Sequence, residues 1–134
     1  MKIGLIGAGR LGICLALLIE KAGYEVLASD NRVDYINSLQ KGIIDTAEPE
    51  VQQYLSDAKN IEFTTDNIRV ISECDLIFTL VATPSLADGS YDVSAVWKVI
   101  DDFKDIPILL DEKSLVIGCT TNPGDCNDFQ EALK

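Results

Sequence analysis

Three glycines near the start of the chain have the spacing of a phosphate-binding loop. Gly7, Gly9 and Gly12 follow the apolar run KIGLI and open the apolar segment RLGICLALLIEKAG. In a strand-turn-helix unit the first glycine allows the tight turn, the second lets the backbone approach a pyrophosphate, and the third lets the helix pack closely on the strand. Backbone N–H groups and the positive end of the helix dipole can hold phosphates there. The spacing predicts a dinucleotide site formed by Gly7, Ala8, Gly9, Arg10, Leu11 and Gly12.

An acidic side chain at the end of the next apolar run would complete such a site. Asp30 ends the segment YEVLASD, 18 residues after Gly12. A carboxylate there can accept hydrogen bonds from the adenosine ribose diol and would repel a 2′-phosphate, so the sequence favours NAD over NADP. Arg32 is either a group that a 2′-phosphate would attract or a solvent-exposed residue at a helix start. Arg10 either approaches the pyrophosphate or points into water.

The segments that must position these residues alternate between strand and helix patterns. Short apolar runs predict strands at 2–6, 24–30, 61–65, 75–82 and 114–120, and the segments between them contain helical periodicity. The most continuously apolar run, DLIFTLVA, is typical of a strand in the centre of a parallel sheet that is covered on both faces. The sequence therefore predicts an α/β fold, a Rossmann-like doubly wound parallel sheet with right-handed crossovers, in a single domain over residues 1–134.

The helical segments carry start and stop signals of their own. Gly23 and Gly42 can end the first and second helices, and Pro49 fits the first position of the third. Asp66 and Asp92 are candidate N-caps of two later helices. In the first helix, apolar residues that repeat with helical period predict a buried stripe of Leu11, Cys14, Leu15, Leu18 and Ala22.

Composition disfavours several classes of function. Eleven Lys and Arg face 22 Asp and Glu, and the net charge of −11 repels nucleic acid and anionic membrane surfaces. No apolar run reaches the roughly 20 residues that span a bilayer, and the N-terminus does not read as a signal peptide. We therefore expect a cytoplasmic protein with no nucleic-acid or membrane partner. There is no histidine, and four cysteines without CxxC spacing predict packing thiols and no metal site: Cys14, Cys74, Cys119 and Cys126.

Several motifs together resemble the N-terminal NAD-binding domain of the UDP-glucose/GDP-mannose dehydrogenase family. Besides the glycine loop and Asp30 they are LQKGI, EPEVQQYL, FTTD, ATPSLADGSYDVSAV and CTTNPGD, spread over essentially all 134 residues. The loop TPSLADGSYD is the most specific, because a parallel α/β sheet does not by itself require it. The resemblance implies that NAD contacts the glycine loop, Asp30, Thr83 and Thr121. Each threonine follows an apolar strand, where ligands bind, or is a turn hydroxyl that caps local backbone.

Members of this family oxidise the C6 alcohol of a nucleotide sugar to a carboxylate, with two NAD and a cysteine that carries a thioester. The resemblance implies this function for a longer enzyme. The family's catalytic cysteine, lysine and asparagine lie in later domains that bind the nucleotide sugar, so we assign no catalytic residue and expect no activity from these 134 residues alone. The sequence departs from the family at Arg32, which often is a second acid, at Tyr35, often a lysine, and at NPGDC, usually VPVGT.

Two other functions stay open. A stand-alone NAD-binding regulatory module should expose no large apolar surface, whereas a domain of a longer enzyme should expose the surface that meets the rest, and could form a homodimer through it. Another NAD-dependent hydroxyacid dehydrogenase also could open with a glycine loop that contains arginine. That class is expected to follow its fourth strand with a loop different from TPSLADGSYD.

Overall fold

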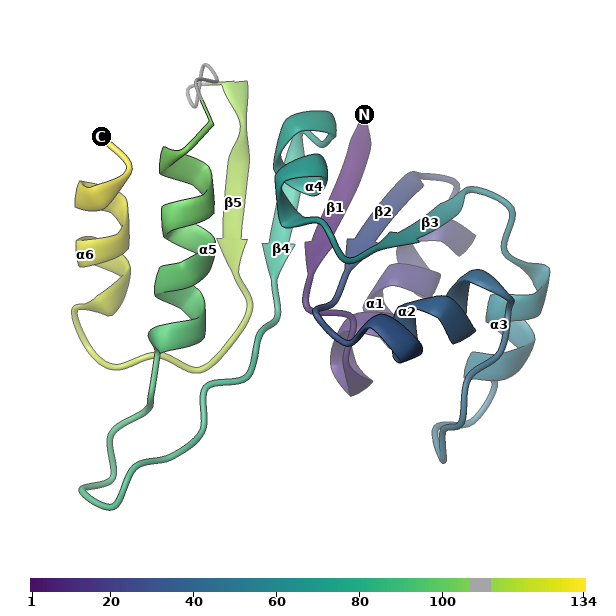
Figure 1. The fold of residues 1–134 in the computed structure, drawn as a ribbon, viewed down its shortest axis with the longest axis horizontal. Helices are drawn as coiled ribbons and strands as arrows, with labels where there is room; N and C mark the ends of the chain where they lie inside the picture. The colour runs from purple at the N-terminus through teal and green to yellow at the C-terminus, as the bar shows by residue number, and fades with distance from the viewer. Residues whose placement is uncertain (107–111) are drawn as a thin grey trace.

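The apolar runs of the sequence form parallel strands, and the segments between them form helices (Figure 1). The structure is a computed structural model that describes residues 1–106 and 112–134. Within these residues the strands are β1 (Lys2–Ile6), β2 (Glu25–Ser29), β3 (Ile61–Thr64), β4 (Leu76–Thr79) and β5 (Ser114–Ile117). The helices are α1 (Arg10–Lys21), α2 (Val33–Gln40), α3 (Val51–Asp57), α4 (Asn67–Glu73), α5 (Ser94–Lys104) and α6 (Asp125–Ala132).

The strand order places a change of winding direction next to β1. The sheet runs β3-β2-β1-β4-β5, and each pair of neighbours is parallel. The chain winds outward from β1 to β3, crosses back to β4 on the other side of β1, and continues to β5. Ile6, the last residue of β1, is therefore in register with both Ser29 and Thr79. This arrangement confirms the doubly wound parallel sheet, and ligands of such sheets bind where the winding reverses.

Alternating residues of β1 face two separate helical layers. Leu5 packs in one core with Ile13 of α1, and this layer also holds α2 and α3. Gly4 faces the opposite layer, where a Cβ on it would lie 2.6 Å from Val70 of α4. That layer continues through α5 to α6, whose Phe129 is 2% exposed. In Figure 1, α5 and α6 lie beside β5 at one end of the sheet, and α1 to α3 surround the other end.

The buried face of α1 differs from the predicted stripe. Its buried residues are Gly12, Ile13, Ala16 and Leu17. Leu11 and Leu18, which the periodicity placed inside, are 64% and 53% exposed. This helix is apolar on nearly every side, so periodicity alone could not choose its face. The small residues Gly12 and Ala16 decide it, because they let the helix axis approach β1 closely.

An open apolar groove lies where the helices leave β4 uncovered on the side of α1. It has a volume of about 330 Å³. It is lined by Met1, Ile3, Leu18, Ile19, Ala22, Tyr24, Leu76 and Phe78. Val116 of β5 is also 38% exposed. The run DLIFTLVA is thus fully covered on one face only, because α5 and α6 pack on the same side as α4. On the side of α1, Phe78 and Leu80 pack against the core but are only partly buried.

Helix boundaries follow most of the predicted signals. Asp66 caps α4, and its carboxylate accepts a hydrogen bond from a first-turn backbone N–H at 3.2 Å. Pro49 is not the first residue of α3, because Glu50 intervenes as the N-cap in a left-handed conformation with φ of 65°. Asp92 lies one residue too early, since the N-cap of α5 is Val93.

The contact between α1 and β1 leads to a test of stability. A Cβ at Gly12 would lie 2.0 Å from the carbonyl oxygen of Gly7, so Gly12→Ala must push the helix off the strand. We expect the free energy of unfolding to fall by about 3 kcal/mol, which outweighs about 1 kcal/mol of gained helix propensity. Urea denaturation measures the change.

Gly9→Ala is the matched control in the same loop. Among the described residues, the Arg32 guanidinium is the only group within 4 Å of the point where a Cβ at this position would stand, and it lies 3.9 Å away. Its free energy of unfolding should change by less than about 1 kcal/mol. Equal losses in the two variants would contradict the packing role of Gly12.

Candidate functional site

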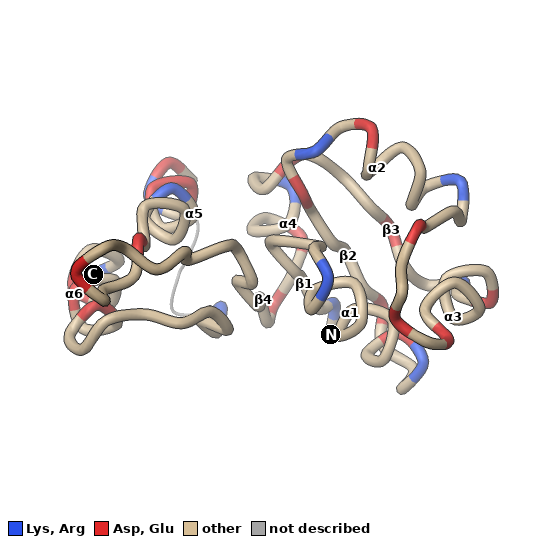
Figure 2. Tube along the Cα trace, turned by 90° about the horizontal axis from the view of Figure 1, so that it is seen from below, with Lys and Arg blue, Asp and Glu red and all other residues tan. Residues whose placement is uncertain are grey.

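A hollow of about 850 Å³ opens at the carboxyl edge of the sheet, where the winding reverses. Figure 2 views the molecule from this edge. The hollow draws residues from the glycine loop, the end of β2, the segment after β4, and the starts of α4 and α5. Residues that line it include Gly7, Gly9, Arg10, Asp30, Arg32, Asn67, Leu80 and Lys98. The structure thus brings the predicted glycine loop and Asp30 to one cavity.

The three glycines of the loop serve different purposes. Gly7 has φ of 100°, and a Cβ there would lie 2.7 Å from the carbonyl of Leu80. Gly12 is required by the contact with Gly7 described above. Gly9 is required by neither conformation nor packing, since its φ is −68° and a Cβ there would make only an ordinary contact with Arg32 Nη2, at 3.9 Å. The fold explains Gly7 and Gly12, whereas the absence of a side chain at Gly9 leaves room for a molecule in the hollow.

The N-terminus of α1 supplies backbone donors to this hollow. The N–H groups of Arg10, Leu11 and Gly12 belong to the first turn and have no partner within the helix. No side chain of the described residues caps this end, and its first turn contains no acid. The positive end of the helix dipole is therefore available to an anion such as a phosphate.

Arg10, which lines the hollow, is paired with an acid. Its guanidinium forms an ion pair with Glu48, in the connection between α2 and α3, and the Arg10 side chain is 82% exposed. The two predicted roles for Arg10 were a pyrophosphate contact and a side chain in water. The exposure agrees with the second of these roles, and the ion pair with Glu48 adds a partner that the sequence did not indicate.

Asp30 lies at the end of β2 with its side chain only 8% exposed. One carboxylate oxygen, Oδ1, accepts hydrogen bonds from the Arg32 backbone N–H at 3.1 Å and from Arg32 Nε at 2.8 Å. The other, Oδ2, accepts from Arg32 Nη2 at 3.0 Å. Burial alone would raise the pKa of Asp30, but the hydrogen bonds and charge of Arg32 outweigh burial and lower it below 3.8. Asp30 is therefore ionised at neutral pH.

Tyr35 connects α2 to the glycine loop. Its hydroxyl donates to the carbonyl oxygen of Ala8 at 2.7 Å. The Arg32 guanidinium carbon lies 4.2 Å from the centroid of the Tyr35 ring, a cation–π contact. Sequence reasoning noted Tyr35 only as a departure from the family. Its contact with Ala8, 27 residues earlier, has no signal in local periodicity.

Thr83 and Thr121 lie in two loops beyond the hollow. The described residues that line the hollow do not include either threonine. Both are half-buried, and Thr121 Oγ1 is 3.8 Å from Cys126 Sγ. Asn122 joins the two loops: its Oδ1 accepts from the Tyr91 N–H at 2.8 Å, and its Nδ2 donates to the Tyr91 carbonyl at 3.0 Å. The loops TPSLADGSYD and TTNPGD therefore form one ledge at the edge of the sheet.

A polar network that the sequence did not indicate connects three elements at the hollow. Ser29, at the end of β2, donates through Oγ to Asn67 Oδ1 at 2.7 Å. Asn67 Nδ2 in turn donates to Asp102 Oδ2 on α5 at 3.0 Å. Both Asn67 and Asp102 line the hollow. The network connects β2 to the opposite helical layer, so both layers help to position the walls of the site.

Three of the four predicted packing thiols are at least partly buried, whereas Cys126 is exposed. Burial raises the pKa of Cys14 and Cys119, and it raises that of Cys74 to about 11. These three thiols are protonated at neutral pH and are poor nucleophiles. Within residues 1–106 and 112–134 no group of three or more His, Cys, Asp or Glu could hold a metal ion. No helix in the same ranges is long and apolar enough to cross a membrane.

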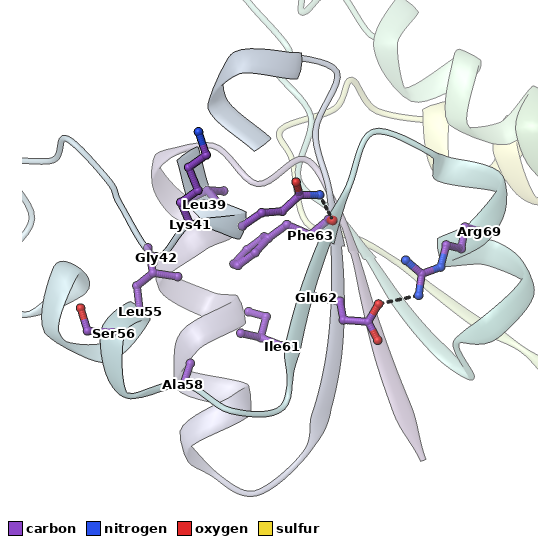
Figure 3. Close-up of a pocket in the computed structure, with 11 residues that line it drawn as sticks. Leu39, Lys41, Gly42, Leu55, Ser56, Ala58, Ile61, Glu62, Phe63 and Arg69 are labelled. Carbon is purple, nitrogen blue, oxygen red and sulfur yellow. Dashed lines mark hydrogen bonds and ion pairs between the residues drawn. The ribbon is translucent and has the colours of Figure 1, made fainter. Parts of the chain in front are cut away.

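A second hollow, of about 700 Å³, lies between α2, α3 and β3 (Figure 3). Most of its polar side chains already pair with one another or with backbone. Gln40 Nε2 donates to the Phe63 carbonyl at 2.9 Å, and Arg69 Nη2 contacts Glu62 Oε2 at 2.6 Å. It contains no residue of the glycine loop. The hollow at the carboxyl edge is therefore the better candidate for a ligand site.

The strand order and the glycine loop at the start of α1 are those of a dinucleotide-binding domain of the Rossmann type. Comparison with known families identifies one family within this class. Residues 1–134 match the model of the UDP-glucose/GDP-mannose dehydrogenase family, NAD binding domain. The chain belongs to this family and carries its NAD-binding domain.

Individual relatives agree with the family model. The chain is 32% identical over 133 residues to the Bacillus subtilis protein YtcA, provisionally named a UDP-glucose 6-dehydrogenase, covering 99% of this chain and 31% of that protein. It is 30% identical to the UDP-glucose 6-dehydrogenase of Rickettsia bellii, over 100% of this chain and 31% of the relative. A crystal structure of GDP-mannose dehydrogenase from Pseudomonas aeruginosa superimposes with a TM-score of 0.90 at 25% identity, over 99% of this chain and 31% of that chain. The chain thus spans about a third of the length of these proteins.

The Tyr35 contact leads to a test of how the glycine loop is supported. Tyr35→Phe removes the hydroxyl that donates to the Ala8 carbonyl and leaves the ring in place. We expect the free energy of unfolding to fall by about 1 kcal/mol. Urea denaturation measures it, and Tyr24→Phe, at a ring 43% exposed, is the control that should show no change. An unchanged Tyr35→Phe variant would show that this hydrogen bond contributes nothing.

Proposed function

We propose that this chain is the cofactor domain of a nucleotide-sugar 6-dehydrogenase and binds NAD in the hollow at the carboxyl edge of the sheet. The observation that carries the proposal is the open space at Gly9, directly in front of the uncapped N-terminus of α1. A side chain at this position would fill the space that a pyrophosphate needs. Backbone donors and the helix dipole supply the attraction, so binding needs no cluster of lysines.

Each group of predicted residues would contact a different part of the cofactor. The N–H groups of the loop from Gly7 to Gly12 would hold the pyrophosphate. Asp30, ionised and at the end of β2, would accept hydrogen bonds from the adenosine ribose diol. The ledge that carries Thr83 and Thr121 would contact the nicotinamide half. NAD, when bound, supplies the hydride acceptor for oxidation of an alcohol.

The substrate and the catalytic groups are proposed to belong to further domains. Two relatives are named for UDP-glucose and one neighbour for GDP-mannose, and the chain spans 31% of each. Burial raises the pKa of the Cys14, Cys74 and Cys119 thiols, and the sequence has no histidine. We infer that oxidation of the sugar C6 alcohol requires groups beyond these 134 residues, and that the nucleotide sugar binds with them.

The alternatives from the sequence are less well supported. A stand-alone regulatory module should have no exposed apolar surface, whereas the apolar groove leaves Leu18 and Tyr24 53% and 43% exposed. A homodimer, or the rest of a longer enzyme, would cover this groove. The loop TPSLADGSYD disfavours another hydroxyacid dehydrogenase, as the family match does. Four free cysteines fit a reducing compartment and support a cytoplasmic location.

Calorimetric titration with NAD tests the proposed site. We expect saturable binding, a loss of at least about tenfold in affinity for Asp30→Ala, and loss of detectable binding for Gly9→Ala. Asp57→Ala, an exposed acid on α3, is the matched control and should bind like the wild type. Absence of NAD binding, or binding that neither site variant changes, would contradict the proposed site.

The lowered pKa of Asp30 leads to an expected pH dependence. The carboxyl remains ionised at any pH well above its folded pKa, which the hydrogen bonds and charge of Arg32 hold below the ordinary value of an aspartate. The affinity for NAD should therefore stay within about twofold between pH 8 and pH 5 and fall only at lower pH, as Asp30 takes up a proton. Titrations at pH 8, 6.5 and 5 measure this. A steady loss of affinity from pH 7 to pH 5 would show that a group with a higher pKa receives the ribose.

A further inference from the structure

The carboxylate proposed for the ribose already has a partner. Arg32 meets both oxygens of Asp30, through Nε at 2.8 Å and Nη2 at 3.0 Å. This two-pronged geometry uses the lone pairs with which a carboxylate would receive a diol. The ribose of a bound dinucleotide must therefore displace Arg32 or share Asp30 with it. The presence of an acid at the end of β2 does not by itself describe this site.

The guanidinium has a second support that does not depend on Asp30. It lies over the ring of Tyr35, which is held by its hydrogen bond to Ala8. Arg32 Nη2 also lies 3.9 Å from the point where a Cβ of Gly9 would stand. Arg32 therefore borders the same space as the glycine loop. When the pair with Asp30 opens, Tyr35 can keep the positive charge beside the adenosine ribose.

The charges at this position cancel. An unpaired carboxylate excludes a 2′-phosphate by repulsion, which is how an acid at the end of this strand selects NAD. Here the carboxylate and the guanidinium form a neutral pair, and a guanidinium binds phosphate with two parallel hydrogen bonds. The Arg32 side chain is 56% exposed and lines the hollow, so a ligand can reach it. Arg10, which also lines the hollow, is paired with Glu48.

We propose that Arg32 determines the cofactor preference of this site, and that it admits the 2′-phosphate of NADP next to Asp30. This inference rests on the proposed dinucleotide site. NAD binds with its ribose on Asp30 after Arg32 has released the carboxylate and stays over the Tyr35 ring. NADP binds with its 2′-phosphate on the same guanidinium. Arg32 therefore competes with the ribose of NAD for Asp30, and it attracts the extra phosphate of NADP.

The experiment compares the dissociation constants of NAD and NADP for the 134-residue chain by calorimetric titration. In the wild type we expect the NADP constant to lie within about tenfold of the NAD constant. Arg32→Ala should raise the ratio of the NADP constant to the NAD constant by at least about tenfold. The NAD constant should stay the same or fall by up to about threefold, because the competitor for Asp30 is gone. Asp30→Asn should lower the ratio.

Two further variants separate the role of Arg32 from a general effect of charge. Arg32→Lys keeps the charge but not the planar fork, so its ratio should lie between those of the wild type and Arg32→Ala. Arg69→Ala removes an arginine that pairs with Glu62 and Glu73 outside the hollow, and it should leave the ratio unchanged. Thermal unfolding checks that each variant is folded, which we expect since the Arg32 side chain is exposed.

The outcomes distinguish this inference from the proposed function. A rise of the ratio in Arg32→Ala alone supports the role of Arg32. A ratio that Arg32→Ala leaves within about twofold of the wild type, or a wild type that binds NAD but shows no NADP binding at a thousandfold higher concentration, overturns that role and leaves NAD binding intact. If neither nucleotide binds to the wild type, the proposed site fails and this inference fails with it.

Discussion

The close contact between α1 and β1 is the constraint on which the site depends. Because Gly12 has no side chain, α1 can approach β1 until the backbone at Gly12 lies directly against the backbone of Gly7. This contact places the N-terminus of α1 at the carboxyl edge of the sheet, next to β1 and β4, so its unpaired N–H groups lie at the hollow. On the other side of β1, Gly4 leaves room for the side chains of Val70 and Cys74, which come from α4 and its C-cap. Two glycines thus set the distance between the sheet and its two helical layers.

Sequence reasoning found those parts of the site that follow directly from strand ends. Gly7 and Asp30 follow adjacent parallel strands, so their proximity could be predicted from a correct strand order. The sequence could not show that Tyr35 supports Ala8, or that Asn67 joins Ser29 to Asp102, because these contacts connect residues far apart in the chain. The buried face of α1 was predicted wrongly, since a helix that is apolar all round gives periodicity no contrast. The nicotinamide contacts of Thr83 and Thr121 stay predictions.

The charge of the molecule and the charge of the site act at different distances. Acidic residues are spread over α3, α5 and α6 in Figure 2, and the net charge of −11 acts on any approaching anion. The backbone dipoles at the N-terminus of α1, however, act within a few ångströms of the loop, where salt screens them less than it screens the distant charges. An acidic domain can therefore receive a dinucleotide and still reject a polyanion.

The bond between Asn122 and Tyr91 has a consequence for how this edge of the sheet can change. The two loops leave different strands and are separated by α5, yet one amide side chain meets both the N–H and the carbonyl of the same residue. A shift of either loop must carry the other with it or break two hydrogen bonds. The two loops therefore act as a single mechanical unit: a displacement that begins in one is transmitted to the other, and both respond together to a molecule that presses on either.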